Sequence, residues 1–126
     1  MRVRELAAVA VGGAIGATLR WSIGSWIAGR TGAGFPWHTM FINVVGAFLL
    51  GVLMALSLEK GVMSGDWRLF LGTGVLGGFT TFSTLSYESI ALVQDGLWAA
   101  GLANMFGSAI LGLAAAVLGL VVGRAM

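Results

Sequence analysis

Four long apolar stretches, separated by short linkers that carry glycine and charge, account for most of the sequence. A bilayer core takes roughly 20 apolar residues in helical form, and each stretch is at least that long. The pattern predicts an all-α integral membrane protein whose single domain covers residues 1–126. The expected transmembrane helices run over approximately residues 5–28, 37–58, 67–93 and 97–122. Tryptophans at or near their ends, typical of an interfacial aromatic belt, are Trp26, Trp37, Trp67 and Trp98.

The first stretch resembles a signal peptide, because Arg2 and Arg4 precede it. It is longer than the usual hydrophobic region of a signal peptide, and three more apolar stretches follow, so we interpret it as a retained span. An even number of spans puts both termini on one side of the membrane. Lysine and arginine are more frequent on that side, which favours cytoplasmic termini. The basic residues counted there are Arg2, Arg4, Lys60, Arg68 and Arg124, against Arg30 on the other side, with Arg20 added if it faces that end.

The third stretch differs from the others because glycines are followed by a run of hydroxyl side chains. The glycines lie between Gly72 and Gly78, and the hydroxyl run extends from Thr80 to Ser86, two residues before Glu88. Glycines followed by a run of hydroxyl side chains are not expected in a continuous helix that faces lipid. Broken helices occur at membrane depth only where protein or water satisfies the freed backbone groups. The sequence therefore predicts an interruption at about residues 77–81, buried in an assembly.

Charged or amide side chains inside the apolar stretches are costly, and they are therefore candidates for function. They are Arg20, Asn43, Glu88 and Asn104. Arg20 could extend its guanidinium to the interface, or it could hold a positive charge at an aqueous vestibule that concentrates anions. Asn43 could join helices by hydrogen bonds, or it could offer the two N–H donors of its amide to an anion.

The remaining polar and aromatic candidates also allow two interpretations each. Glu88 suits a proton-coupled transporter, but it could equally cap neighbouring donors. Asn104 and Ser108 are four residues apart and share one helix face, which is either a packing contact or one wall of a polar track. Phe82 is most simply a packing residue, although an aromatic edge carries partial positive charge and can face an anion. The single histidine, His38, is interpreted as an ordinary interface residue.

Composition excludes several classes of protein. The chain is 58% hydrophobic and only 10% charged, whereas a soluble domain usually carries about 25% charged residues. Its basic residues form no cluster, so no nucleic-acid partner is expected. The sequence has no cysteine, which excludes disulfides and cysteine-bound metal. It shows no Ser-His-acid set, metal-ligand cluster or phosphate-binding loop, so we do not expect an enzyme.

Four segments, in order along the chain, resemble the Fluc (CrcB) family of fluoride channels. They are GGAIGATLRW in the first stretch, HTMFINVVGAFLLG in the second, GTGVLGGFTTFSTLSYE in the third and NMFGS in the fourth. Together they extend over nearly the whole chain. The string GGFTTFST inside the third stretch is the most specific of them, and NMFGS alone would be weak.

The resemblance implies an antiparallel, dual-topology homodimer with two pores, through which fluoride leaves the bacterial cytoplasm passively across the inner membrane. It also implies a central structural Na⁺ held by the backbone carbonyls of Gly77 and Thr80 from both subunits, and carbonyl oxygens do suit a hard cation. Leu85 stands where the family commonly has a second phenylalanine, and Asn104 where tyrosine is frequent. By position, the residues on or near the pore are Arg20, Asn43, Phe82, Ser83, Thr84, Leu85, Glu88, Asn104 and Ser108.

We therefore expect a passive fluoride-selective channel, with fluoride, sodium, the lipid bilayer and a second copy of the chain as partners. The charge asymmetry leaves open pairing with an oppositely oriented homologue. One alternative is a proton-coupled exporter like the small multidrug resistance family. That family relies on a glutamate in the middle of its first helix, and here Glu88 would take its role because Glu5 lies at the helix start. A second alternative is a non-conducting membrane subunit whose hydroxyl run serves packing.

Overall fold

The computed structural model describes residues 2–126, and residue 1 of the predicted domain lies outside them. All regular secondary structure in the described residues is helical. Four helical stretches are long and apolar enough to cross a membrane, which confirms the prediction of an all-α protein with four such helices. These stretches are Val3–Thr31, Trp37–Glu59, Gly65–Gln94 and Trp98–Ala125.

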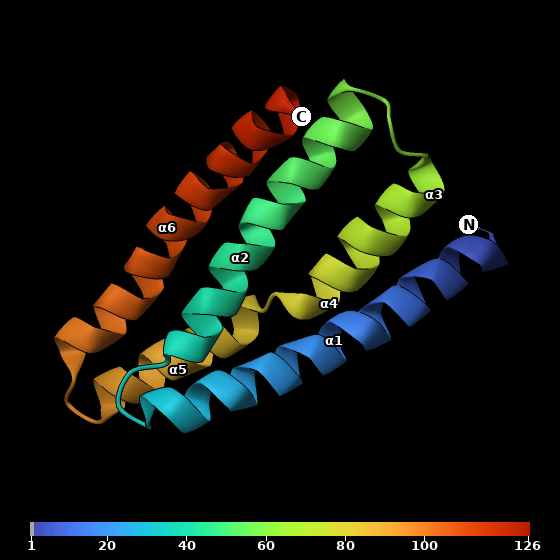
Figure 1. Cartoon of the computed structure of the whole chain (residues 1–126). Helices are drawn as coiled ribbons and strands as arrows, with labels where there is room; N and C mark the ends of the chain where they lie inside the picture. The colour runs from blue at the N-terminus through green and yellow to red at the C-terminus, as the bar shows by residue number, and fades with distance from the viewer. Residues whose placement is uncertain (1) are drawn as a thin grey trace.

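The outer spans are single helices and the two inner ones are composite (Figure 1). The first span is α1 (Val3–Thr31) and the last is α6 (Trp98–Ala125). In the second span, α2 (Trp37–Met54) continues into the π-helical turn η1 (Ala55–Glu59). The third span consists of α3 (Gly65–Arg68), the π-helical η2 (Leu69–Leu76), α4 (Gly77–Phe79) and α5 (Phe82–Gln94). π-helical turns are rare in proteins, and those that occur often lie at functional sites.

Most helix ends lie slightly outside the predicted limits, and only the last helix begins one residue later than expected, at Trp98. The apolar stretch marks the part of a helix that suits the membrane, whereas local capping decides where the helix stops. At the start of α1, the Glu5 carboxylate accepts the N–H of Arg2 at 3.2 Å. At its end, Gly32 adopts a φ of 79°, a left-handed conformation that stops a helix and favours glycine.

The spans pack in two close pairs, with α2 along α6 and α1 along η2 and α4 (Figure 1). Small residues permit this approach, as is common between membrane helices. A Cβ added at Gly16 would collide with the carbonyl oxygen of Val75, and one added at Gly74 would lie 2.9 Å from the Cα of Gly12. Both termini of the described chain lie at one end of the bundle, as Figure 1 shows. Large apolar side chains cover much of the outer surface, which suits a lipid environment.

The helical backbone of the third span stops at Phe79 and resumes at Phe82 (Figure 1). Between them, Thr80 has φ −82° and ψ 158°, and Thr81 has φ −152° and ψ 114°, so both residues are extended. The side chain of Thr81 caps the new helix by accepting the N–H of Thr84 at 3.2 Å. Because Thr80 and Thr81 are extended, their backbone N–H and C=O groups are available inside the bundle, where side chains from other helices can bind them.

Candidate ion pathway

Asn43, on α2, binds the extended backbone of Thr81 with both ends of its amide. Its Nδ2 donates to the carbonyl oxygen of Thr81 at 3.0 Å, and its Oδ1 accepts the N–H of Thr81 at 2.7 Å. This pairing fixes the orientation of the amide, because the nitrogen must face an acceptor and the oxygen a donor. One of the two N–H donors of the amide is consumed in this way, and one is left for a ligand.

The interruption also releases two backbone carbonyls from helical bonding. In a continuous helix the N–H of Thr81 would donate to the carbonyl of Gly77, and the N–H of Thr84 to that of Thr80. Here the N–H of Thr81 donates to Asn43, and the N–H of Thr84 donates to the Thr81 hydroxyl. The carbonyls of Gly77 and Thr80 therefore lose their helical donors, and both residues line a cavity.

This cavity, which we call the central cavity, has a volume of about 370 Å³. It is largely apolar and carries polar groups at only a few points, as ligand sites commonly do. Several of the residues proposed for the pore meet here from three spans. The residues of that set that line the central cavity are Asn43, Phe82, Leu85 and Ser108, and Gly77 and Thr80 of the expected sodium site line it as well.

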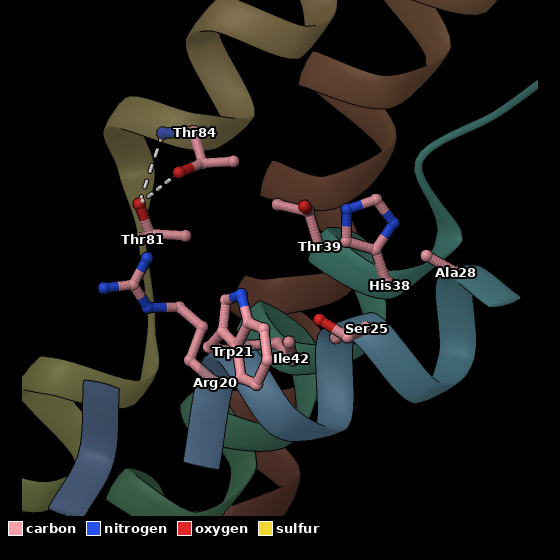
Figure 2. A pocket seen from close by; sticks show the side chains of 10 residues that line it. Arg20, Trp21, Ser25, Ala28, His38, Thr39, Ile42, Thr81 and Thr84 are labelled. Carbon is pink, nitrogen blue, oxygen red and sulfur yellow. Dashed lines mark hydrogen bonds between the residues drawn. The ribbon is translucent and has the colours of Figure 1, made fainter. Parts of the chain in front are cut away.

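A second, intermediate cavity of about 220 Å³ shares Thr81 with the central cavity, and Figure 2 shows side chains that line it. Arg20, on α1, lines it together with Thr84, and Figure 2 shows both facing the extended segment. The Nε of Arg20 donates to the carbonyl oxygen of Gly78 at 3.1 Å, so this guanidinium also binds the interruption. The Thr81 hydroxyl lies 3.1 Å from that of Thr84 and 3.2 Å from that of Ser83. Three hydroxyls of the run, those of Thr81, Ser83 and Thr84, thus form one connected hydrogen-bonding group.

A third, outer cavity of about 410 Å³ lies at the end of the bundle near the linker between α1 and α2. Tyr87, Glu88 and Asp95 line it, together with His38. His38 also lines the intermediate cavity, just as Thr81 lines both the intermediate and the central one. The three cavities are therefore neighbours that share polar wall residues, His38 between the outer and the intermediate cavity and Thr81 between the intermediate and the central one.

His38, which the sequence led us to interpret as an ordinary interface residue, contacts a residue proposed for the pore. Its Nε2 lies 3.2 Å from the Oε2 of Glu88. A signal for this contact was present in the sequence. His38 begins the second apolar stretch and Glu88 lies near the end of the third, so antiparallel neighbouring spans bring both residues to the same end of the bundle.

Two predicted residues of α6 differ in their surroundings. Asn104 is fully buried between α5 and α6, where its Nδ2 donates to the Ser89 hydroxyl at 3.0 Å. Ser89 in turn donates to the carbonyl of Leu85 at 2.7 Å. Ser108 is 5% exposed and lines the central cavity. In the single chain, therefore, Ser108 faces the cavity, and Asn104 joins two helices.

The α5 side chains at the interruption divide between core and surface. Leu85 is 6% exposed and packs in the core, whereas Phe82 is 74% exposed although it borders the central cavity. Ser83 is exposed as well. A phenylalanine and a serine beside such a cavity form a surface that a lipid or another protein chain would cover.

Comparison with known proteins identifies the family. A sequence model described as CrcB-like protein, Camphor Resistance (CrcB), matches residues 7–120. The chain belongs to the CrcB family. A protein of Thermus thermophilus named fluoride-specific ion channel FluC is 53% identical over 126 residues, which is 100% of this chain and 98% of that protein. Together with the four apolar helices, this membership makes the chain a multi-pass bacterial membrane protein.

Two further CrcB family members extend the similarity to distant bacteria. Proteins of the same name from Rhizobium meliloti and Chloroflexus aurantiacus are 46% and 43% identical to the chain. The first alignment covers 94% of each chain and the second covers 97% of each. The similarity therefore extends over all four spans. The resemblance that the third stretch carried is thereby confirmed at the level of the family.

Proposed function

We propose that the chain is a passive, fluoride-selective channel that lets fluoride leave the cytoplasm. The names of the CrcB relatives support the ion, and the series of three cavities supports a path for it. The observation that carries the proposal is the interruption at Thr80 and Thr81. It gathers amide, hydroxyl and guanidinium donors along the cavities without adding a carboxylate at that depth.

Fluoride is small and strongly hydrated, so a selective pathway has to replace its water with closely spaced donors. The free N–H of Asn43 and the hydroxyls of Thr84 and Ser108 are such donors, and the edge of Phe82 adds partial positive charge. Apolar walls between them give a larger halide no compensation for the water that it would lose. Selectivity would follow from donor spacing and width, as in other channels.

The proposed working unit is an antiparallel dimer of dual topology with two pores. The exposed faces of Phe82 and Ser83 beside the central cavity support it, because a second copy would cover them and complete the walls. The carbonyl oxygens of Gly77 and Thr80, which lack helical donors, would hold a structural Na⁺ between the copies. Carbonyl oxygen is a ligand that hard cations prefer. Unfolding at a higher temperature in sodium than in choline salts would support this site, and identical midpoints would contradict it.

Efflux from liposomes tests the channel proposal directly. Vesicles loaded with equal fluoride and chloride, and held at zero potential, should release fluoride far faster than chloride when they contain the protein. Protein-free vesicles give the background. Release of both halides at one rate would contradict selectivity, and no release of fluoride would contradict the function itself.

The contact between His38 and Glu88 is the observation that favours the alternative, a proton-coupled exporter. The two functions differ in their driving force. A coupled exporter accumulates or expels fluoride when only a pH gradient is applied, and it does so against the fluoride gradient. We expect fluoride to move down its own electrochemical gradient alone, and uphill transport driven by protons would contradict a passive channel.

A further inference from the structure

His38 and Glu88 form a polar contact between α2 and α5 at the end of the proposed pathway. The Nε2 of His38 and the Oε2 of Glu88 are 3.2 Å apart, and the two side chains are 29% and 20% exposed. A carboxylate can only accept, so Nε2 must carry a proton in this contact. The other ring nitrogen, Nδ1, is then either a bare acceptor on a neutral ring or an N–H donor on a charged one.

The pair stands where two cavities meet. His38 lines both the intermediate cavity and the outer cavity, and Glu88 lines the outer one. Figure 2 shows the imidazole beside Thr39 on one side of the intermediate cavity, with Arg20, Thr81 and Thr84 on the other. An ion on a path from the outer cavity to Thr81 would therefore pass close to the imidazole.

Each residue of the pair also holds a buried polar atom whose hydrogen bonding the described chain does not satisfy. Within residues 2–126, neither Nδ1 of His38 nor Oε1 of Glu88 has a partner, although both atoms are buried. A buried polar atom without a partner is destabilising, because it has lost its hydrogen bonds to water and gained none in the protein. Two of them on one contact, beside two cavities, indicate a site that takes up something further, such as a proton or a ligand.

The charges around the pair come from the elements packed on it. From α1, Arg20 lines the intermediate cavity, and from α5 and the turn that follows, Tyr87 and Asp95 line the outer one. The only titratable side chain of α6 is Arg124, which pairs with Glu59 at the opposite end of the bundle. With a neutral imidazole, the outer cavity therefore presents carboxylates to an approaching anion.

We propose that His38 and Glu88 form a proton-dependent anion site, which admits fluoride to the pathway only when the imidazole carries its second proton. This inference rests on the proposed function. The proton comes from the aqueous mouth, adds to the lone pair of Nδ1 and leaves by the same route, and no covalent bond is made. Protonation cancels the charge of Glu88 and converts Nδ1 from a buried acceptor into an N–H donor for the anion.

The sign of the effect follows from these charges. Imidazole is the side chain that ordinarily changes charge between about pH 5 and 8. Lower pH in this range should therefore speed fluoride passage, because the mouth becomes less negative by one charge, with Asp95 unchanged, and gains a donor. Focused charge at a narrow mouth changes local ion concentration by about tenfold or more, and we expect a rate difference of about that size.

Fluoride efflux from liposomes tests the proposal, with equal pH on both sides so that no proton gradient exists. The wild type should release fluoride about tenfold faster at about pH 6 than at about pH 8 after subtraction of protein-free vesicles. His38→Gln keeps an N–H for Glu88 but cannot take a charge, so its two rates should be equal. Asp95→Asn removes the other carboxylate of the outer cavity and should retain the pH ratio of the wild type.

A binding measurement on the wild type makes the test independent of whether the variant folds. His38 is the single histidine, so the ¹⁵N signals of its ring report on this site alone. Fluoride, but not chloride, should change the ¹⁵N signals of the ring at about pH 6. Equal wild-type rates at the two pH values, a pH ratio that survives in His38→Gln, or ring signals that fluoride leaves unchanged would each overturn the proposal. No efflux at either pH would instead overturn the channel function.

Discussion

At the scale of single residues, the side-chain amide of Asn43 supplies the hydrogen bonds that the backbone of Thr81 would make in a continuous helix. Asn43 donates to and accepts from the backbone of Thr81, so the carbonyl of Gly77 lacks its helical donor. The Thr81 hydroxyl takes the N–H of Thr84, which leaves the carbonyl of Thr80 without its helical donor as well. A buried extended pair of residues would be destabilising without such partners. The same residue thus stabilises the interruption and keeps one N–H for an ion.

Asn43→Asp separates these two roles sharply. The aspartate would still accept the N–H of Thr81, but its second oxygen would face the Thr81 carbonyl, so that two acceptors oppose each other. It would also add a negative charge at the central cavity. We expect fluoride efflux to be abolished and the protein to be destabilised by about 1–3 kcal/mol. Efflux traces and thermal unfolding in detergent measure the two effects.

The second asparagine of the chain provides the matched control. Asn104 is buried between α5 and α6 and binds Ser89, away from the interruption. Asn104→Asp should destabilise the protein to a similar extent while it retains measurable fluoride efflux. If Asn43→Asp conducts normally, Asn43 is not in the pore. If the two variants lose efflux equally, the loss at Asn43 reflects folding and not ion binding.

At the scale of elements, the sequence predicted the number and approximate positions of the helices, because membrane length imposes long apolar stretches. The details that it could not predict are those set by contacts between spans. The use of the Asn43 amide by Thr81 depends on where α2 meets the third span, and the π-helical turns η1 and η2 have no clear signature in composition. The contact of His38 with Glu88 was not predicted either, although the antiparallel order of the second and third spans brings both residues to one end of the bundle.

Close packing of α1 against the third span suggests a test with two glycines of one helix. A Cβ at Gly16 would collide with the Val75 carbonyl and would lie 2.8 Å from the backbone nitrogen of Phe79, whereas a Cβ at Gly13 meets nothing within 4 Å. Gly16→Ala should therefore push α4 away and destabilise the protein by about 1–3 kcal/mol. Gly13→Ala should unfold at the wild-type temperature, and equal behaviour of the two variants would contradict this packing.

At the scale of the whole molecule, the open question is how copies lie in the membrane. Both termini lie at one end of the bundle, and the basic residues are more frequent there. A single orientation follows from that asymmetry if it is strong enough. Dual topology follows if it is weak, and the exposed surface at Phe82 then meets its antiparallel counterpart in a closed, two-fold pair.

Cysteine labelling distinguishes the two arrangements without background, because the chain contains no cysteine. Gly34, in the linker between α1 and α2, and Val62, in the linker at the opposite end, are both exposed. In dual topology, a membrane-impermeant maleimide added outside intact cells should label about half of the copies of Gly34→Cys and about half of Val62→Cys. In a single topology, one variant would be labelled completely and the other not at all. Labelling after cell lysis gives the total for each variant. Complete protection of either cysteine in intact cells would rule out an antiparallel homodimer, and pairing with an oppositely oriented homologue would remain.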